Sequence, residues 1–155
     1  MTVALTLADT GNPRDVSNDR RRAIPARNAF MMSNMLSEIT RSGTAQRARR
    51  ELKRADLFGK TGTTNDQRDA WFNGYNQSMV TNVWVGFDSN KKLGRREFGS
   101  RAALPAWVDY MRVALEGEAD KSPSLPEGML TVRIDPKTGL RAPAGMQGAI
   151  FELFR

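Results

Sequence analysis

Apolar residues recur along the chain at two spacings, one typical of helices and one typical of strands. Helical spacing runs from Pro25 to Ser42-Gly43, where glycine can take the left-handed conformation that ends a helix. A second helical stripe covers residues 103–114 and is expected to form another helix. Alternating or β-branched segments predict four strands, at residues 1–7, 56–63, 70–76 and 79–87.

The order of these segments predicts an α+β fold. A helix precedes an antiparallel meander of three strands and a second helix follows it, so we expect helices to flank a sheet. A short hairpin connection is predicted at Gln77-Ser78. Between the first helix and the meander, Thr44 is expected to cap a short basic helix. Met31, Met32 and Met35 on the first helix are interpreted as core-packing residues.

Changes in composition divide the chain into three parts. Residues 1–22 are expected to hold a strand and a polar linker, residues 23–118 the helices and the meander, and residues 119–155 a C-terminal extension. The extension contains one predicted strand, at residues 129–134. Lys137-Thr138-Gly139 comes shortly after that strand, directly behind Asp-Pro, and is interpreted as a turn with no site role.

Composition narrows the chemistry that the chain can perform. Its 155 residues include no cysteine and no histidine, which excludes disulfides, a thiolate nucleophile, an imidazole base and His-ligated zinc. We therefore expect no metal and no cofactor, and any acid–base step must use Lys, Asp, Glu or Tyr. No stretch approaches the roughly 20 apolar residues of a membrane-spanning helix, and no signal peptide is expected at the start.

The net charge of +7 raises the alternative of a non-catalytic basic module that binds nucleic acid, peptidoglycan or a protein. The basic residues gather at Arg20–Arg22 and again between Arg47 and Arg54. The second cluster is spread around its predicted helix, with few aromatic residues nearby to stack on bases. We therefore expect no nucleic-acid binding and interpret the cluster as a solvated or partner-facing surface.

The candidate chemistry lies in the stretch Phe58-Gly59-Lys60-Thr61-Gly62-Thr63-Thr64. Lys60 supplies positive charge, and Gly62 lacks the Cβ that would keep a ligand from the backbone. Thr61 and Thr63 share a face if the segment is extended. These features predict a cradle for a carboxylate or phosphate, although a bare Lys-Thr-Gly also occurs in polar hairpin strands.

A nucleotide-binding phosphate loop is one alternative for this stretch. That loop requires a glycine where Arg54 stands and a helix that begins at the lysine. Here Asn65-Asp66-Gln67-Arg68 is typical of a turn, and an aromatic strand follows. The nucleotide interpretation fails on both requirements.

The surroundings of this stretch carry a resemblance to a known family. The segments are Phe58–Asp66, Asp69–Tyr75 and Val83–Asp88, with Arg41–Ala45, Leu93–Gly99, Ala103–Trp107 and Pro126–Gly128 beside them. Together they resemble the C-terminal part of the transpeptidase domain of bifunctional class A penicillin-binding proteins, closest to the 1A type of Gram-negative bacteria. The resemblance covers about residues 22–155 and implies a partial serine-transpeptidase or β-lactamase-like fold.

The family implies a serine acyltransferase with three motifs, Ser-x-x-Lys, Ser-x-Asn and Lys-Thr-Gly. Its serine attacks the D-Ala-D-Ala end of a peptidoglycan stem peptide, and β-lactams acylate the same serine. By this resemblance Lys60 supplies charge beside the substrate carboxylate, and the Thr61 and Thr63 hydroxyls hold that carboxylate. The Thr63 N–H would form half of an oxyanion hole. Gly62 and Thr64 complete the implied substrate-binding set.

The chain has no credible copy of the other two motifs. Ser89-Asn90-Lys91-Lys92 matches Ser-x-x-Lys formally, but it follows a strand in a polar turn, whereas the family's nucleophile opens a buried helix before Lys-Thr-Gly. We therefore expect the isolated chain to be inactive, whether it is a fragment or a separate reading frame.

The missing motifs would come from the remainder of the transpeptidase domain or from another copy of the chain. By resemblance, the parent protein would face the periplasm from the inner membrane. Without its partner elements, strand 80–87 and helix 103–114 are expected to expose apolar surface.

Overall fold

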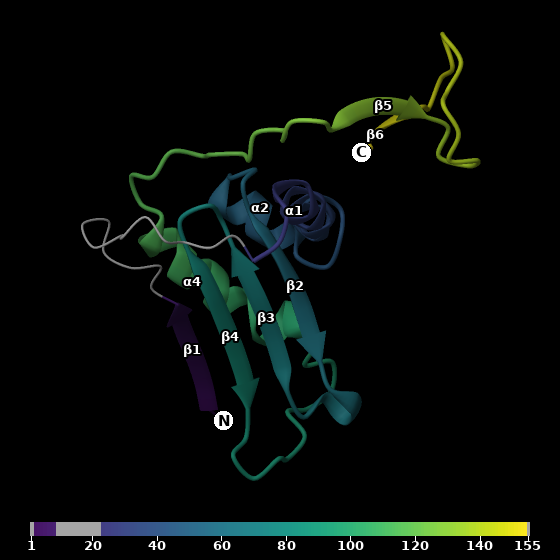
Figure 1. The fold of residues 1–155 in the computed structure, drawn as a ribbon. Coiled ribbons are helices and arrows are strands. Elements are labelled where there is room, and N and C mark those ends of the chain that lie inside the picture. The colour runs from purple at the N-terminus through teal and green to yellow at the C-terminus, as the bar shows by residue number, and fades with distance from the viewer. Residues whose placement is uncertain (1, 9–22, 155) are drawn as a thin grey trace. The chain divides into compact units, whose positions relative to one another are not determined.

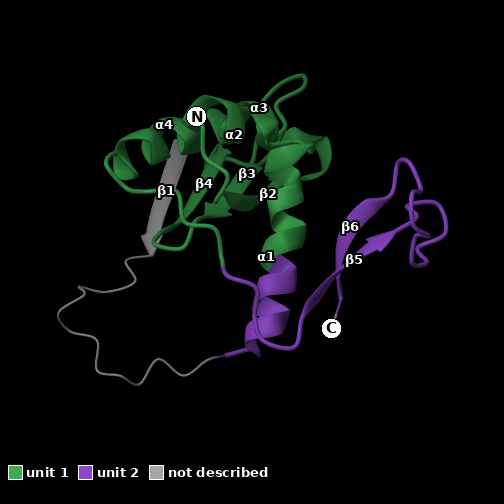
Figure 2. Cartoon of the chain, turned by 90° about the horizontal axis from the view of Figure 1, so that it is seen from above, with its two compact units in different colours: residues 1–21, 33–123 green, residues 22–32, 124–155 purple. Residues whose placement is uncertain are grey.

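The computed structural model describes residues 2–8 and 23–154, and it forms two compact units (Figure 2). The sheet unit comprises residues 1–21 and 33–123, and the hairpin unit comprises residues 22–32 and 124–155. The strand expected at the N-terminus is confirmed, whereas the polar linker expected after it lies outside the described residues.

A four-stranded antiparallel sheet forms the centre of the sheet unit (Figure 1). The predicted three-strand meander is confirmed, and the N-terminal strand joins it as a fourth member by pairing along the whole of β4. The spatial order β1-β4-β3-β2 places β2 at an edge of the sheet. The strands are β1 (Thr2–Ala8), β2 (Phe58–Thr63), β3 (Ala70–Tyr75) and β4 (Val80–Gly86).

Helices complete the α+β architecture that the sequence predicted. Helix α4 buries an apolar stripe against β3 and β4, as the spacing of residues 103–114 indicated, and a separate short helix precedes it. The helices are α1 (Ala26–Arg41), α2 (Gln46–Leu52), α3 (Gly99–Ala102) and α4 (Leu104–Ala114), with a 3-10 turn, η1, at Asn65–Gln67.

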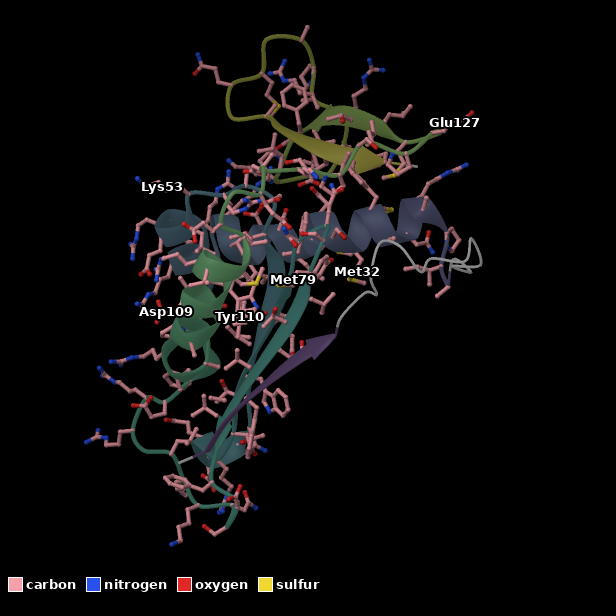
Figure 3. All side chains as sticks on the ribbon, turned by 90° about the vertical axis from the view of Figure 1, so that its left-hand side faces the viewer. Met32, Lys53, Met79, Asp109, Tyr110 and Glu127 are labelled. Carbon is pink, nitrogen blue, oxygen red and sulfur yellow. The ribbon has the colours of Figure 1, made fainter. Side chains whose placement is uncertain are left out.

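The core of the sheet unit is centred on Trp107 of α4. Its ring meets the edge of Phe72 with centroids 4.9 Å apart, and its Nε1 donates a hydrogen bond to the Thr81 carbonyl oxygen at 3.1 Å. No side chain fits at Gly74, where a Cβ would come within 2.6 Å of this indole. Met79 and Tyr110 pack against the same core and are labelled in Figure 3.

Two expectations about exposed and buried apolar surface need correction. Strand β4 is an interior strand that pairs with β1, and α4 buries Leu104, Trp107, Val108 and Met111, so only single apolar side chains of these elements, Val80 and Val113, are exposed. The core-packing role expected for Met32 and Met35 on α1 was also wrong, because their side chains are 51% and 57% exposed. Helix α1 makes polar contacts with the sheet unit, through the hydroxyl of Ser33 to that of Tyr75 on β3 and the hydroxyl of Thr40 to the Leu57 carbonyl oxygen just before β2.

The hairpin unit contains two antiparallel strands, β5 (Leu130–Ile134) and β6 (Ile150–Phe154). The sequence predicted β5 but not β6. The second Lys-Thr-Gly forms the expected turn, because the Asp135 carboxylate accepts the Lys137 N–H at 2.9 Å and the Thr138 hydroxyl at 3.1 Å.

Candidate functional site

The register between β2 and β3 determines which way each side chain of the candidate stretch points. Thr61 lies opposite Phe72 and Thr63 lies opposite Ala70, both of which face the buried α4 side of the sheet. Residues directly opposite in an antiparallel pair share a face, so the two threonines lie together, as the alternation predicted. Lys60 lies on the other face of the strand.

Lys60 places its positive charge close to its own backbone. The side chain is exposed, and Nζ donates a hydrogen bond to the Thr61 carbonyl oxygen at 2.9 Å. Within the part of the chain that the structure describes, no carboxylate lies within ion-pair distance of this ammonium. The charge is therefore available at the strand for an anionic ligand.

Thr63 is held by the segment that begins α3. The Gly99 N–H donates a hydrogen bond to Thr63 Oγ1 at 3.0 Å. This close approach requires glycine, because a Cβ at position 99 would lie 2.3 Å from the Trp71 carbonyl oxygen and 2.6 Å from that of Gly62. Gly62 also has a packing role, since its own Cβ would lie 3.1 Å from the Trp71 side chain.

Thr61 has a partner on the loop between α1 and α2. Its Oγ1 lies 3.2 Å from Thr44 Oγ1, and either hydroxyl can be the donor. The expected capping role of Thr44 was wrong, because Ala45 is the N-cap residue of α2 and makes no side-chain cap. The sequence offered no signal for this contact, since Thr44 stands 17 residues before Thr61.

Thr64 closes the turn that follows β2. Its Oγ1 accepts the Asp69 N–H at 2.8 Å, and its own N–H donates to the Asp69 carbonyl oxygen at 3.0 Å. The loop of residues 88–98 braces this turn, because Gln67 accepts the N–H of Leu93 through its carbonyl and that of Glu97 through its side chain. The end of β2 is therefore fixed from two sides.

The other sequence candidates, Ser89 and the basic cluster of residues 47–54, show no features of a site. Ser89 is exposed in a turn after β4 and opens no helix. The basic cluster of residues 47–54 is broken by acidic partners, since Arg47 pairs with Glu51 at 2.5 Å and Arg54 pairs with buried Asp56 at 2.7 Å. Among the described residues there is no group of three metal-ligating side chains, and no helix has the length and apolar character to cross a membrane.

Comparisons with known proteins find relatives of this chain, although no protein-family model matches the sequence. The chain is 51% identical over 134 residues to penicillin-binding protein 1A of Pseudomonas aeruginosa, covering 86% of this chain and 16% of that protein. It is 48% identical over 110 residues to penicillin-binding protein 1A of Neisseria gonorrhoeae, covering 71% of this chain and 14% of that protein.

The fold is also similar to a solved structure. The crystal structure of penicillin-binding protein 1A from Haemophilus influenzae matches with a TM-score of 0.79 and 38% sequence identity, over 86% of this chain and 21% of that one. The α+β assignment is thereby confirmed. The chain is homologous over most of its length to penicillin-binding protein 1A of Gram-negative bacteria, and it spans about a sixth of the length of these relatives.

Proposed function

From the homology to penicillin-binding protein 1A, we propose that this chain forms the Lys-Thr-Gly wall of a serine D,D-transpeptidase site that cross-links peptidoglycan stem peptides. The observation that carries the proposal is the edge strand β2, which presents Lys60, Thr61 and Thr63 beside a strand edge that no other described strand covers. A peptide in extended conformation can bind along such an edge through main-chain hydrogen bonds.

In this proposal each group has a defined role. The hydroxyls of Thr61 and Thr63 donate to the terminal carboxylate of the stem peptide, and Lys60 stabilises its charge. The serine oxygen attacks the penultimate D-alanine carbonyl, and the Thr63 N–H stabilises the oxyanion of the tetrahedral intermediate. Terminal D-alanine leaves with a proton, and an amine of a neighbouring stem peptide then takes the acyl group and releases the serine.

The nucleophile and its base must then come from outside the described residues. The family's serine opens a helix, and Ser89, the formal match, lies in an exposed turn. We propose that the remainder of a transpeptidase domain, or a second copy, completes the site at the periplasmic face of the inner membrane. The β-lactams would acylate the serine of that completed site.

Labelling with a fluorescent penicillin tests this proposal. The chain alone should acquire no covalent label, whereas co-expression with the preceding part of penicillin-binding protein 1A from Pseudomonas aeruginosa should give label on that partner. Lys60→Ala in this chain should reduce the restored labelling about 100-fold, because it removes charge stabilisation from the site. Lys137→Ala, in the second Lys-Thr-Gly, is the matched control and should leave labelling unchanged.

Two results would contradict the proposal. Label on the isolated chain, mapped to Ser89, would assign the nucleophile to this sequence. If the restored labelling is the same with Lys60→Ala as with the unchanged chain, β2 does not form part of the site.

A further inference from the structure

Both threonine hydroxyls on β2 have a hydrogen-bond partner outside the sheet. Thr63 Oγ1 receives the Gly99 N–H at 3.0 Å, and Thr61 Oγ1 lies 3.2 Å from Thr44 Oγ1. Gly99 stands 36 residues after Thr63, and Thr44 stands 17 residues before Thr61. Two segments distant in sequence thus meet the same face of one strand.

These contacts determine where the hydroxyl protons are available. A backbone N–H can only donate, so Thr63 Oγ1 is the acceptor of the Gly99 bond and its own proton remains free. In the described part of the chain, that proton has no acceptor. The Thr44–Thr61 hydroxyl pair uses one of its two protons internally. When Thr44 is the donor, the proton of Thr61 is the one that remains for a ligand.

We propose that Thr44 and the Gly99 N–H are positioning groups that orient the β2 hydroxyls as two hydrogen-bond donors for a single carboxylate. The inference rests on the proposed function and adds to it the source of the preference for an anion. An ionised carboxylate accepts hydrogen bonds through two oxygens and donates none, so it matches two outward protons. A neutral amide in the same place presents one oxygen and an N–H group that would oppose one of the donors.

If the Thr44 hydroxyl only stabilised the fold, its loss would change stability and not ligand binding. Thr44 and Thr63 are exposed, and an exposed hydroxyl–hydroxyl bond contributes little to stability because water replaces it. Loss of the Thr44 hydroxyl should therefore leave the fold intact and change ligand binding.

The test is a titration of the ¹⁵N-labelled full chain, followed by NMR. N-acetyl-D-alanyl-D-alanine is the probe, and its C-terminal amide is the neutral control. The free acid should shift the amide resonances of Thr63 and Gly99, and the neutral amide should not. Thr44→Val should weaken binding of the acid about fivefold, the loss expected for a misoriented hydrogen bond to a charged group, and Thr44→Ser should restore it.

The controls separate this inference from the proposed function. Thr131→Val removes an exposed threonine hydroxyl from β5 and should leave binding unchanged. If the wild-type chain binds the acid and Thr44→Val binds it equally well, the positioning role is overturned while the proposed function stands. If the wild-type chain binds neither probe, the proposed function of β2 fails and the inference fails with it.

A second variant keeps the test decisive if Thr44→Val does not fold. Thr63→Val removes the acceptor of the Gly99 N–H, so the Gly99 amide should shift and exchange its hydrogen faster. An unchanged Gly99 resonance would overturn the role assigned to that amide.

Discussion

Replacing Asp56 by alanine is expected to destabilise the sheet unit by about 3 kcal/mol, because it leaves the Arg54 guanidinium, whose side chain is only 10% exposed, without its carboxylate. Asp56 is fully buried and accepts two hydrogen bonds from Arg54, at 2.8 Å and 2.7 Å. It also accepts the Lys121 N–H at 3.0 Å. The pair thus ties the segment after α4 to the start of β2.

The expected loss for Asp56→Ala depends on the hydrogen bonds that the Arg54 guanidinium keeps. Its guanidinium also donates to the carbonyl oxygens of Glu118 and Ala119, at 2.6 Å and 2.9 Å, so part of its hydrogen bonding survives the substitution. The expected loss therefore lies at the lower end of the roughly 3–5 kcal/mol found when one member of a buried ion pair is removed.

Asp109→Ala is the matched control for this substitution. Asp109 on α4, labelled in Figure 3, pairs with Arg112 at 2.6 Å, but their side chains are 69% and 50% exposed. Removing an exposed pair should cost less than about 1 kcal/mol. Urea unfolding followed by tryptophan fluorescence measures both variants, since all three tryptophans lie in the sheet unit.

The pH dependence of the free energy of unfolding provides a second test of the Arg54–Asp56 pair. Burial raises the pKa of the Asp56 carboxyl, but hydrogen bonds from Arg54 and the Lys121 N–H outweigh it and hold the pKa below its usual range. As the pH falls below about 4, the unfolded chain binds the proton first, so the free energy of unfolding decreases. The stabilisation is complete above that range and is lost as the pH falls through the folded pKa.

Asp56→Asn should flatten this acid-side decrease. The reasoning would be refuted if Asp56→Ala cost no more than Asp109→Ala, or if Asp56→Asn left the slope of stability against pH unchanged.

Two further substitutions test how the sheet unit holds β2. Gly99→Ala should destabilise the sheet unit by about 2 kcal/mol, because the added Cβ would overlap the carbonyl oxygens of Trp71 and Gly62. The midpoint of urea unfolding measures this loss, and an undiminished midpoint would contradict the close approach. Trp107→Ala should lower the free energy of unfolding by about 3–5 kcal/mol, because it empties the centre of the core. Unfolding followed by circular dichroism measures this change, and a loss below about 1 kcal/mol would show that the indole is not central to the core.

The sequence predicted the elements whose signals are local. The helical spacing after Pro25 and the β-branched run before Gly86 each contain their own periodicity, so α1 and β4 could be read directly. The pairing of β1 with β4 could not be predicted, because it joins segments almost 80 residues apart, as Leu5 opposite Val83 illustrates. Periodicity likewise marked the methionines of α1 as one face, but it does not say whether a covering element is present.

In the candidate site, too, some features follow from local sequence patterns and others depend on contacts between distant segments. The shared face of Thr61 and Thr63 follows from strand alternation alone. The contacts of Thr44 and Gly99 depend on how a loop and a helix start meet the strand, and no local pattern encodes that. Arg54 shows the limit of counting charges, since the sequence placed it in a basic surface and the structure places it in a buried ion pair.

The two ends of β2 are held by the folded sheet unit, which is consistent with the wall proposed above being formed before the rest of the site is present. Phe58 and Gly59 are buried, and the Phe58 ring stacks on Tyr75 with centroids 5.1 Å apart, so the first part of the strand belongs to the folded unit. Its far end is braced by Gly99. Between these anchors Lys60 and its neighbours remain open to a ligand, because the core is formed mainly by β3, β4 and α4. Under the proposed function, the geometry of β2 that would bind a carboxylate therefore does not depend on the nucleophile, which would come from outside the described residues.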